Sequence, residues 1–297
     1  VVDGVRYDQE PFNTIATASI PVYPESVPAK ATMMTTTDLS SSKTVTMGYG
    51  STAMPDESFY VDWGDGSDVQ LYTPNTNATV SHTYSETGKK TIYCWSESTT
   101  DTEYGKMPPF ENDSYNSQNS WTEIESIDTP LQKIYGGSTH YTANGTIKSK
   151  MFAGAKQLKF VCSDLFENYC DPTQPLAQSC YSFMFYDCRG LTTAPELPAT
   201  TLAKSCYQYM FYGCTSLTTA PELPATTLTH NCYQYMFSGC TSLTTAPELP
   251  ATTLTDYCYQ YMFRDCTSLT TAPELPATKL AQYCYSYMFN GCTSLTT

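Results

Sequence analysis

The chain has 297 residues, which is enough for two domains of ordinary size. Its 15 basic and 29 acidic residues give a formal net charge of -14, and so acidic a surface disfavours nucleic acid and anionic membrane surfaces as partners. Charged residues make up only 15% of the chain, so uncharged polar side chains and tyrosines supply its polarity, which favours an extracellular protein. The sequence also lacks the ~18–20 uninterrupted apolar residues of a membrane-spanning helix.

The N-terminal part predicts an extended arm followed by a β-rich domain. Residues 1–30 contain several prolines. We expect them to form a linker or a strand contributed by a preceding domain. Over residues 31–98, turn residues separate short runs that are typical of β-strands. These runs are 44–47, 59–63, 80–84 and 90–95. Short strands at regular intervals predict a β-sandwich.

Two motifs in this domain resemble those of the PKD domain, an immunoglobulin-like sandwich. They are YVDWGDGS at 60–67 and HTYSETG at 82–88. Such domains mostly act as spacers and binding modules on secreted or surface proteins, and the resemblance implies the same here. Asp62, Asp65 and Asp68 lack the spacing of an EF-hand calcium loop, so we expect them to cap turns.

Residues 99–146 are predicted to form a connection and then a capping unit for the series of repeats that follows. We call each repeat unit a rung. The segment is rich in Ser, Asn and Tyr and has few apolar positions. The residues expected to start the core and cap its N-terminal end are Ile124, Ile127, Leu131 and Ile134.

From Leu191 the sequence repeats with an unbroken period of 26 residues. Four copies lie at 191–216, 217–242, 243–268 and 269–294, after a degraded forerunner. One such unit buries too little apolar surface to fold alone, whereas stacked units cover one another. The repeats therefore predict a solenoid over residues 147–297.

Within a rung we expect a short strand and then a short helical segment. Two prolines keep the strand at 191–197 short. A turn and helical segment over 200–210 would bring Cys206, Met210 and Cys214 to the inside. The residues that fit a left-handed conformation at its end are Gly213, Gly239, Asp265 and Gly291.

The rung resembles the BspA-like leucine-rich repeat. In the second copy the matching residues are Leu217, the proline-bounded segment 221–224, and Phe237 with Cys240. The rung departs from that family in its length of 26 instead of ~23 residues and in an added Cys-Tyr-x-x-Met. The resemblance implies a surface antigen or adhesin, or a part of a fibre on gut bacteria or their phages. The fold class is then mixed and β-rich: a PKD-like sandwich followed by a leucine-rich-repeat-like solenoid.

Ten of the 13 cysteines form five pairs that lie eight residues apart, at 180/188, 206/214, 232/240, 258/266 and 284/292. A column of buried thiols is favoured over one disulfide per rung. A bridge is more plausible between Cys162 and Cys170, and the eight-residue spacing does not fit zinc. The glutamates at 196, 222, 248 and 274 form either a solvated column, which is favoured, or a calcium-bridged one.

Three positions vary between otherwise nearly invariant copies: 204/230/256/282, 205/231/257/283 and 212/238/264/290. They are either an unconstrained surface or a surface tuned to a ligand, and the tyrosines beside them serve either recognition or the core. The candidate ligand-binding residues are Lys204, Tyr207, Tyr209, Tyr212, His230, Tyr233, Tyr235, Asp256, Tyr257, Tyr259, Tyr261, Arg264, Gln282 and Tyr283.

The sequence lacks a phosphate loop, a nucleophile elbow and a metal-binding histidine pair, so we expect no enzyme activity, cofactor or metal. We predict a secreted or cell-surface binding or adhesion protein whose repetitive face contacts a surface protein or glycan. The alternative is a structural subunit of a surface fibre or phage appendage, with the solenoid as a rigid spacer. Assembly would then use the open solenoid end or the arm 1–30.

Overall fold

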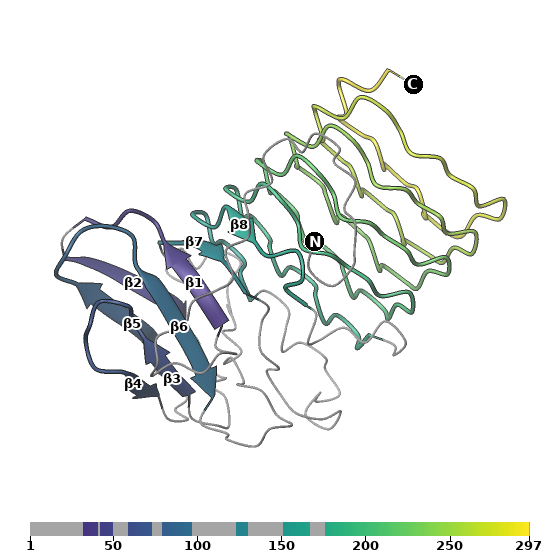
Figure 1. Ribbon diagram of the computed structural model, residues 1–297. Helices are drawn as coiled ribbons and strands as arrows, with labels where there is room; N and C mark the ends of the chain where they lie inside the picture. Colours follow the sequence, from purple (N-terminus) through teal and green to yellow (C-terminus); the bar gives the residue numbers. More distant parts are fainter. Residues whose placement is uncertain are drawn as a thin grey trace, which may run out of the picture.

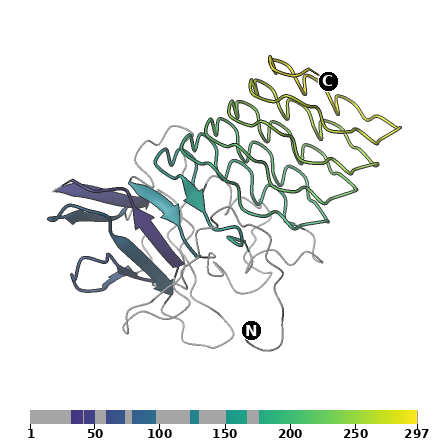
Figure 2. The same ribbon diagram turned by 45° about the horizontal axis from the view of Figure 1, so that its top comes forward.

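The computed structural model describes residues 32–40, 42–49, 59–72, 79–96, 123–129, 151–166 and 176–296. The predicted arm 1–30 lies outside them. Eight strands and an array of stacked rungs make up this part of the chain, which contains no helix (Figures 1 and 2). The strands are β1 (Thr32–Thr36), β2 (Lys43–Tyr49), β3 (Phe59–Asp62), β4 (Gln70–Tyr72), β5 (Thr79–Tyr84), β6 (Thr91–Ser96), β7 (Ile124–Ile127) and β8 (Phe160–Val161).

The strands form two sheets around one core. One sheet has the order β4-β3-β6-β1-β7-β8, and the other pairs β2 with β5 in antiparallel fashion. Side chains from both sheets belong to one buried cluster. Its members, each 0–1% exposed, include Met34, Val45, Met47, Phe59, Val61, Trp63, Val80, Tyr84, Ile92 and Cys94. The β-rich character predicted for this region is confirmed.

The larger sheet continues into the rungs. β7 pairs with β1 on one side and runs parallel to β8 on the other, as Figure 1 shows. Next to β8, the carbonyl of Lys159 accepts a hydrogen bond from the N–H of Thr192 at 3.0 Å. Parallel bridges then join neighbouring rungs at Thr193, Thr219, Thr245 and Thr271. One ladder therefore runs from the N-terminal sheet through the array.

Two of the predicted capping residues lie at this junction. Ile124 and Ile127 are buried in the cluster that also holds the interior side chains of the rungs. Leu131 and Ile134 lie outside the described residues. Because the sheet and the rungs share one core, the junction holds them together through apolar packing as well as hydrogen bonds.

The short helical segment predicted over 200–210 is wrong, since overlapping turns occupy its place. Even-numbered residues from Cys206 to Cys214 donate their N–H to the carbonyl three residues earlier, at 3.1–3.3 Å. Odd-numbered residues from Ser205 to Gly213 donate instead to the carbonyl 25 residues later, in the next rung, at 2.9–3.0 Å. A helix would use all of these N–H groups within the segment, whereas here half of them join the rungs.

Residues with a left-handed backbone conformation, in which φ is positive, recur at every fourth position in this segment. In the first full copy φ is 56° at Ser205, 57° at Tyr209 and 72° at Gly213. Each is the third residue of a hydrogen-bonded turn, which is the position that requires positive φ in a type II turn. The prediction for the final position is confirmed, with values of 77° at Gly239, 58° at Asp265 and 80° at Gly291.

Identical side chains stack inside the array. One column is phenylalanine, with ring centroids 5.4–5.7 Å apart: Phe152, Phe185, Phe211, Phe237, Phe263 and Phe289. A second is tyrosine, with centroids 5.6–5.8 Å apart: Tyr181, Tyr207, Tyr233, Tyr259 and Tyr285. Stacking of this kind adds to the free energy of burying each ring.

The cysteines are core thiols, as predicted. None of the 12 cysteines that the structure describes forms a disulfide, Cys162 included, and all but Cys292 are buried. Cys170 lies outside the described residues. The second thiol of a rung donates to a carbonyl of the previous rung: Sγ of Cys240 lies 3.1 Å from the Phe211 oxygen. Burial raises the pKa of these thiols, to about 12 at Cys232, so they stay protonated donors at neutral pH.

In the native protein, a water-soluble alkylating reagent should label Cys292 at least about tenfold faster than Cys266, because Cys266 is buried and Cys292 is partly exposed. The two sites are separated by tryptic cleavage at Lys279 and quantified by peptide mass spectrometry. In guanidinium chloride both should react at the same rate. Equal rates in the native protein would contradict this burial.

Replacing the junction residue Ile127, which is fully buried, by Ala should lower the free energy of unfolding by about 2–5 kcal/mol. All three tryptophans precede residue 122, so their fluorescence reports the N-terminal part, while exposure of the Cys240 thiol reports the array. Both urea transitions should shift together, and the exposed-site control Thr252→Ala should shift neither. A shift of the fluorescence transition alone would show that the sheet and the array unfold independently.

Candidate binding surface

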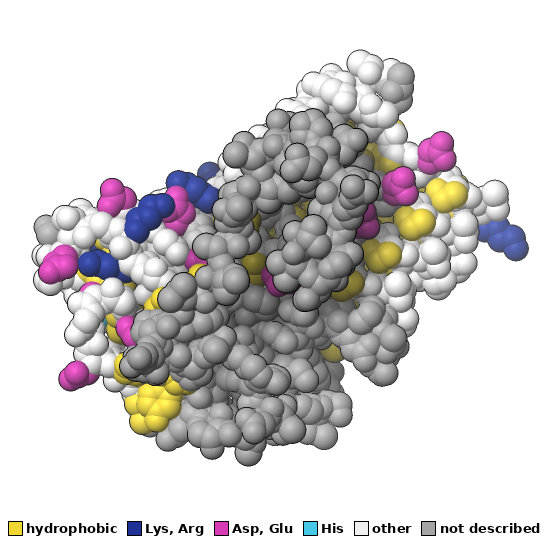
Figure 3. Space-filling view, in the orientation of Figure 1, with side chains coloured by type: hydrophobic (Ala, Val, Ile, Leu, Met, Phe, Trp, Pro, Cys, Tyr) yellow, Lys and Arg dark blue, Asp and Glu magenta, His cyan; other side chains and the backbone are white. Residues whose placement is uncertain are grey.

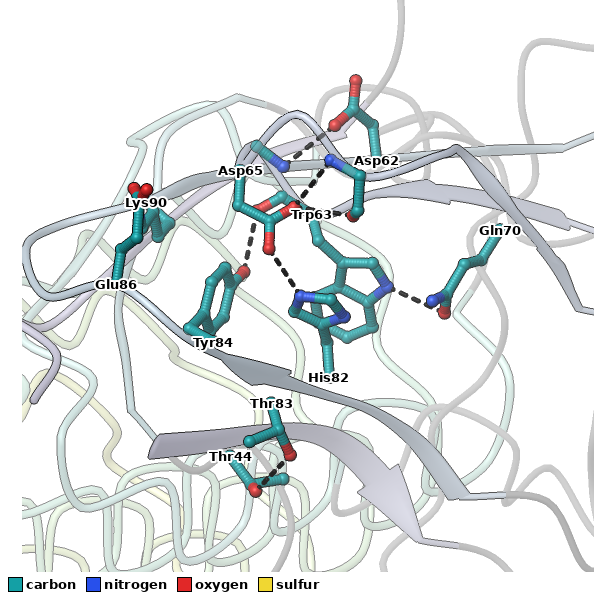
Figure 4. A network of polar contacts seen from close by, with 12 residues as sticks. Thr44, Asp62, Trp63, Asp65, Gln70, His82, Thr83, Tyr84, Glu86 and Lys90 are labelled. Atoms are coloured by element: carbon teal, nitrogen blue, oxygen red, sulfur yellow. Dashed lines mark hydrogen bonds and ion pairs between the residues drawn. The ribbon is translucent and has the colours of Figure 1, made fainter. Parts of the chain in front are cut away.

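A polar network surrounds the turn after β3 (Figure 4). Asp65 places one oxygen 2.7 Å from His82 Nε2 and accepts the Ser67 hydroxyl on the other at 2.6 Å. The His82 ring stacks on Trp63 with centroids 5.2 Å apart, and the Trp63 carbonyl accepts the Tyr84 hydroxyl at 2.8 Å. Partial burial opposes ionisation of Asp65, but hydrogen bonds from Ser67 and His82 outweigh it and lower its pKa to about 2.

This network holds the turn against the second sheet. Ser67 and His82 both bond the Asp65 carboxylate and not each other. The imidazole is therefore not placed to act as a general base that activates the Ser67 hydroxyl as a nucleophile. Asp62 and Asp65 accept the N–H groups of Gly64 and Ser67 at 2.9 and 3.1 Å, which confirms their predicted turn-capping role. A Cβ on Gly64 would lie 2.0 Å from the Thr91 carbonyl oxygen, so the turn requires glycine there.

The array separates the candidate tyrosines into two sets. Tyr207, Tyr233 and Tyr259 are each 1% exposed, so their assignment as ligand-binding residues is corrected: they are core residues. Their rings form the interior tyrosine column, which no partner reaches in the folded protein. The hydroxyls of Tyr207 and Tyr233 find no hydrogen-bond partner within the described part of the chain.

The other set forms a partly exposed stack, which we call the tyrosine face: Tyr209, Tyr235, Tyr261 and Tyr287. Its ring centroids lie 4.5–5.0 Å apart with interplanar angles of 4–11°. Tyr212 lies beside it, 5.8 Å from Tyr209, and the Arg264 guanidinium lies 5.7 Å from the Tyr261 ring. Because each ring covers the face of its neighbour, the inner rings offer a partner mainly their edges and hydroxyls.

The first two variable columns meet at a second surface, the variable edge. The His230 ring lies 5.4 Å from Tyr257, which stacks on Tyr283 at 5.3 Å. Asp256 accepts the N–H of Gln282 at 2.9 Å. These five candidates are therefore brought together. Lys204 occupies the position equivalent to His230 in the preceding rung, and its side chain is exposed.

Some members of these surfaces were missed by sequence reasoning. Phe183 extends the tyrosine face, 4.6 Å from Tyr209, and Tyr186 stacks on Tyr212 at 4.9 Å. Aligning the irregular copy that precedes Leu191 with the regular copies would have identified both residues. Tyr287 occupies the same repeat position as Tyr261 and follows from the period alone.

The glutamates at 196, 222, 248 and 274 are all exposed, as the solvated column requires. Figure 3 shows a row of acidic side chains across the rungs, next to a row of hydrophobic ones. Among the described residues, no group of three or more His, Cys, Asp or Glu side chains is arranged to hold a metal ion.

Comparison with known protein families gives a match for the array of rungs. Residues 178–297 match the family model described as BspA type leucine rich repeat region, in six copies. The repeat half is similar to BspA-like leucine-rich repeats. No curated protein and no solved structure matches the chain, and the family match does not extend to residues 31–98. In the described segments, no helix has the length and apolar character needed to cross a membrane.

The stability of the N-terminal sheets should fall as the pH is lowered from about 4 to 2. The folded pKa of Asp65 is about 2, against an unperturbed value of 3.8, so its stabilisation is complete above pH ~4 and is lost as the carboxylate is protonated. At pH 5, Asp65→Asn should lower the free energy of unfolding by about 1–2 kcal/mol. Urea unfolding followed by tryptophan fluorescence should show this difference shrinking toward pH 2. A difference that is independent of pH would contradict the role of the charge.

Proposed function

We propose that this chain is a secreted or cell-surface binding protein in which a leucine-rich-repeat-like solenoid presents the tyrosine face to a partner protein. The two N-terminal sheets would be a PKD-like sandwich that supports the solenoid. The proposal rests on one observation: tyrosine edges recur every 4.5–5.0 Å along an ordered stack. Tyrosine provides a large contact area at a low cost in side-chain entropy, and repeated rungs raise avidity without a strong single site.

The stacking favours a protein over a glycan as the partner. A sugar packs its C–H groups on the electron-rich face of an aromatic ring. In the tyrosine face these ring faces are covered by neighbouring rings, and the most exposed member is Tyr287, at 60%. Exposed edges and hydroxyls suit the hydrogen bonds and packing of a protein surface, and Arg264 adds a donor of the kind that is enriched in protein interfaces.

A location outside the cell is supported by the low content of charged residues and by the similarity of the repeats to the BspA type. We propose no catalytic role, because the side chains of the Asp65–His82 network bond one another and the turn. A second candidate is a rigid spacer in a fibre or phage appendage, which the unbroken ladder from β1 to Thr296 supports.

Binding would be tested on arrays of purified surface proteins and of glycans, with the wild type and the double variant Tyr235→Ala/Tyr261→Ala. We expect saturable binding to at least one protein and at least about tenfold weaker binding by the variant, as for aromatic interface residues. The matched Tyr235→Phe/Tyr261→Phe variant keeps the rings and removes only the hydroxyls, so its loss should be smaller. Thermal unfolding checks that both variants are folded.

Binding to glycans alone, or an undiminished double alanine variant, would contradict a protein-binding tyrosine face. The spacer hypothesis makes a different prediction. Under it, neither array shows binding and the protein forms filaments or particles, which electron microscopy and light scattering detect.

A further inference from the structure

The first column of the variable edge continues one rung beyond the candidates that lie in it. Gln178 precedes Cys180 by two residues, as Lys204 precedes Cys206, so it occupies the equivalent position in the irregular copy. The column then consists of Gln178, Lys204, His230, Asp256 and Gln282. The carbonyls of the last four each accept an N–H from the preceding rung at 2.9–3.3 Å, which holds the five positions in register.

Two opposite charges in this column form no ion pair with any residue that the structure describes: those of Lys204 and Asp256. Lys204 is exposed, and Asp256 is partly exposed. One carboxylate oxygen of Asp256 accepts the N–H of Gln282 at 2.9 Å, which leaves the other oxygen for a further contact. The two charged residues lie two rungs apart, about 10 Å at the usual spacing of hydrogen-bonded strands, so they are too distant to bond each other.

The column is complementary to its own reverse. In chain order it reads Gln, Lys, His, Asp, Gln. A second copy that runs in the opposite direction, with its His230 against this His230, sets each Lys204 against the partner's Asp256. Both ion pairs form together, because Lys204 and Asp256 lie one rung to either side of His230. The glutamines at the two ends then face each other, and their amides can both donate and accept.

The second column of the variable edge is complementary to its reverse in size. It reads Ser179, Ser205, Asn231, Tyr257 and Tyr283. The rings of Tyr257 and Tyr283 stack with centroids 5.3 Å apart, whereas Ser205 is only 6% exposed. In the same antiparallel arrangement each tyrosine lies over a serine of the partner, so the large side chains of one copy occupy the space above the small ones of the other. A parallel arrangement would instead oppose tyrosine to tyrosine and Lys204 to a second lysine.

We propose that the variable edge binds a second copy of this chain in antiparallel fashion, which gives a closed dimer with a twofold axis at His230. The charge of Lys204 is neutralised by the partner's Asp256 at both ends of the contact, and Tyr257 packs over the partner's Ser205. A twofold contact uses the same surface on both copies, so assembly stops at two chains. The tyrosine face is formed by other residues, and the dimer does not depend on the function proposed for it.

Sedimentation velocity of the whole chain tests for the dimer and for its charges. A species of twice the monomer mass should form as the concentration is raised to about 0.2 mM. Lys204→Glu sets like charges against the partner's Asp256 at both ends of the contact and should weaken dimerisation at least about tenfold. Asp256→Lys should do the same against the partner's Lys204. The control Glu222→Lys reverses a charge at an exposed position outside the variable edge and should dimerise like the wild type.

Mixing the two charge-reversed variants tests the antiparallel register. In a mixed dimer the glutamate introduced at position 204 faces the lysine introduced at position 256, and the native Lys204 and Asp256 face each other. The mixture should therefore dimerise although each variant alone does so poorly. With one variant isotopically labelled, native mass spectrometry separates the mixed dimer from both homodimers, and thermal unfolding checks that each variant is folded.

Ser205→Tyr tests the match in size without changing a charge. The position accepts tyrosine in the single chain, since its equivalent Tyr257 has nearly the same backbone conformation, with φ of 60° against 56°. Against the partner's Tyr257 the added ring should weaken dimerisation. The proposal is overturned by a chain that stays monomeric at about 0.2 mM, by a dimer that withstands both charge reversals or Ser205→Tyr, or by mixed variants that form no dimer. Assemblies larger than two chains would also overturn it, because the twofold contact is closed.

Discussion

The hydrogen bonds from each rung to the next are the constraint on which the rest of the array depends. Odd-numbered residues from Ser205 to Gly213 reach the next rung, while the even-numbered residues between them close turns within their own rung. This division requires a left-handed residue every fourth position, at Tyr209 for example. Left-handed residues other than glycine cost about 1–3 kcal/mol each and persist only where the surroundings impose them. Here the ladder and the stacked side chains impose them in every rung.

The same constraint explains the near identity of the copies. Each interior side chain must match the one above and the one below, so Phe211 stacks between Phe185 and Phe237. The side-chain amides of Gln208, Gln234 and Gln260 also bond from rung to rung. Cysteine suits its column because a thiol packs like a small apolar group and still donates to a carbonyl of the neighbouring rung. Valine would keep the packing but lose that donor.

Features that depend on local pattern were predictable from the sequence. The runs at 44–47, 59–63, 80–84 and 90–95 all lie at strands, and the left-handed glycines and core thiols follow from position and composition. The helical segment was wrong because Cys206, Met210 and Cys214 recur every four residues, a spacing that fits both a helix and a chain of turns. The difference lies in where alternate N–H groups bond, and side-chain identity does not encode that. The parallel pairing of β7 with β8 was missed because it joins distant short segments.

The contrast between Tyr207 and Tyr209 shows why the candidate binding surface was harder to predict than the fold. Both tyrosines are invariant among the regular copies and lie two residues apart, yet Tyr207 is buried and Tyr209 is partly exposed. Invariance within the chain is accounted for by stacking in both columns, so it does not distinguish a ligand-binding residue from a core residue. The positions that can distinguish a ligand-binding surface from the core are those at which the copies differ. Their side chains need not match the equivalent side chains of the neighbouring rungs. Tyr212 and Arg264 share one such column and flank the tyrosine face. In the proposed function, the invariant stack would therefore provide the contact area, and the variable residues beside it would determine specificity for one partner over another.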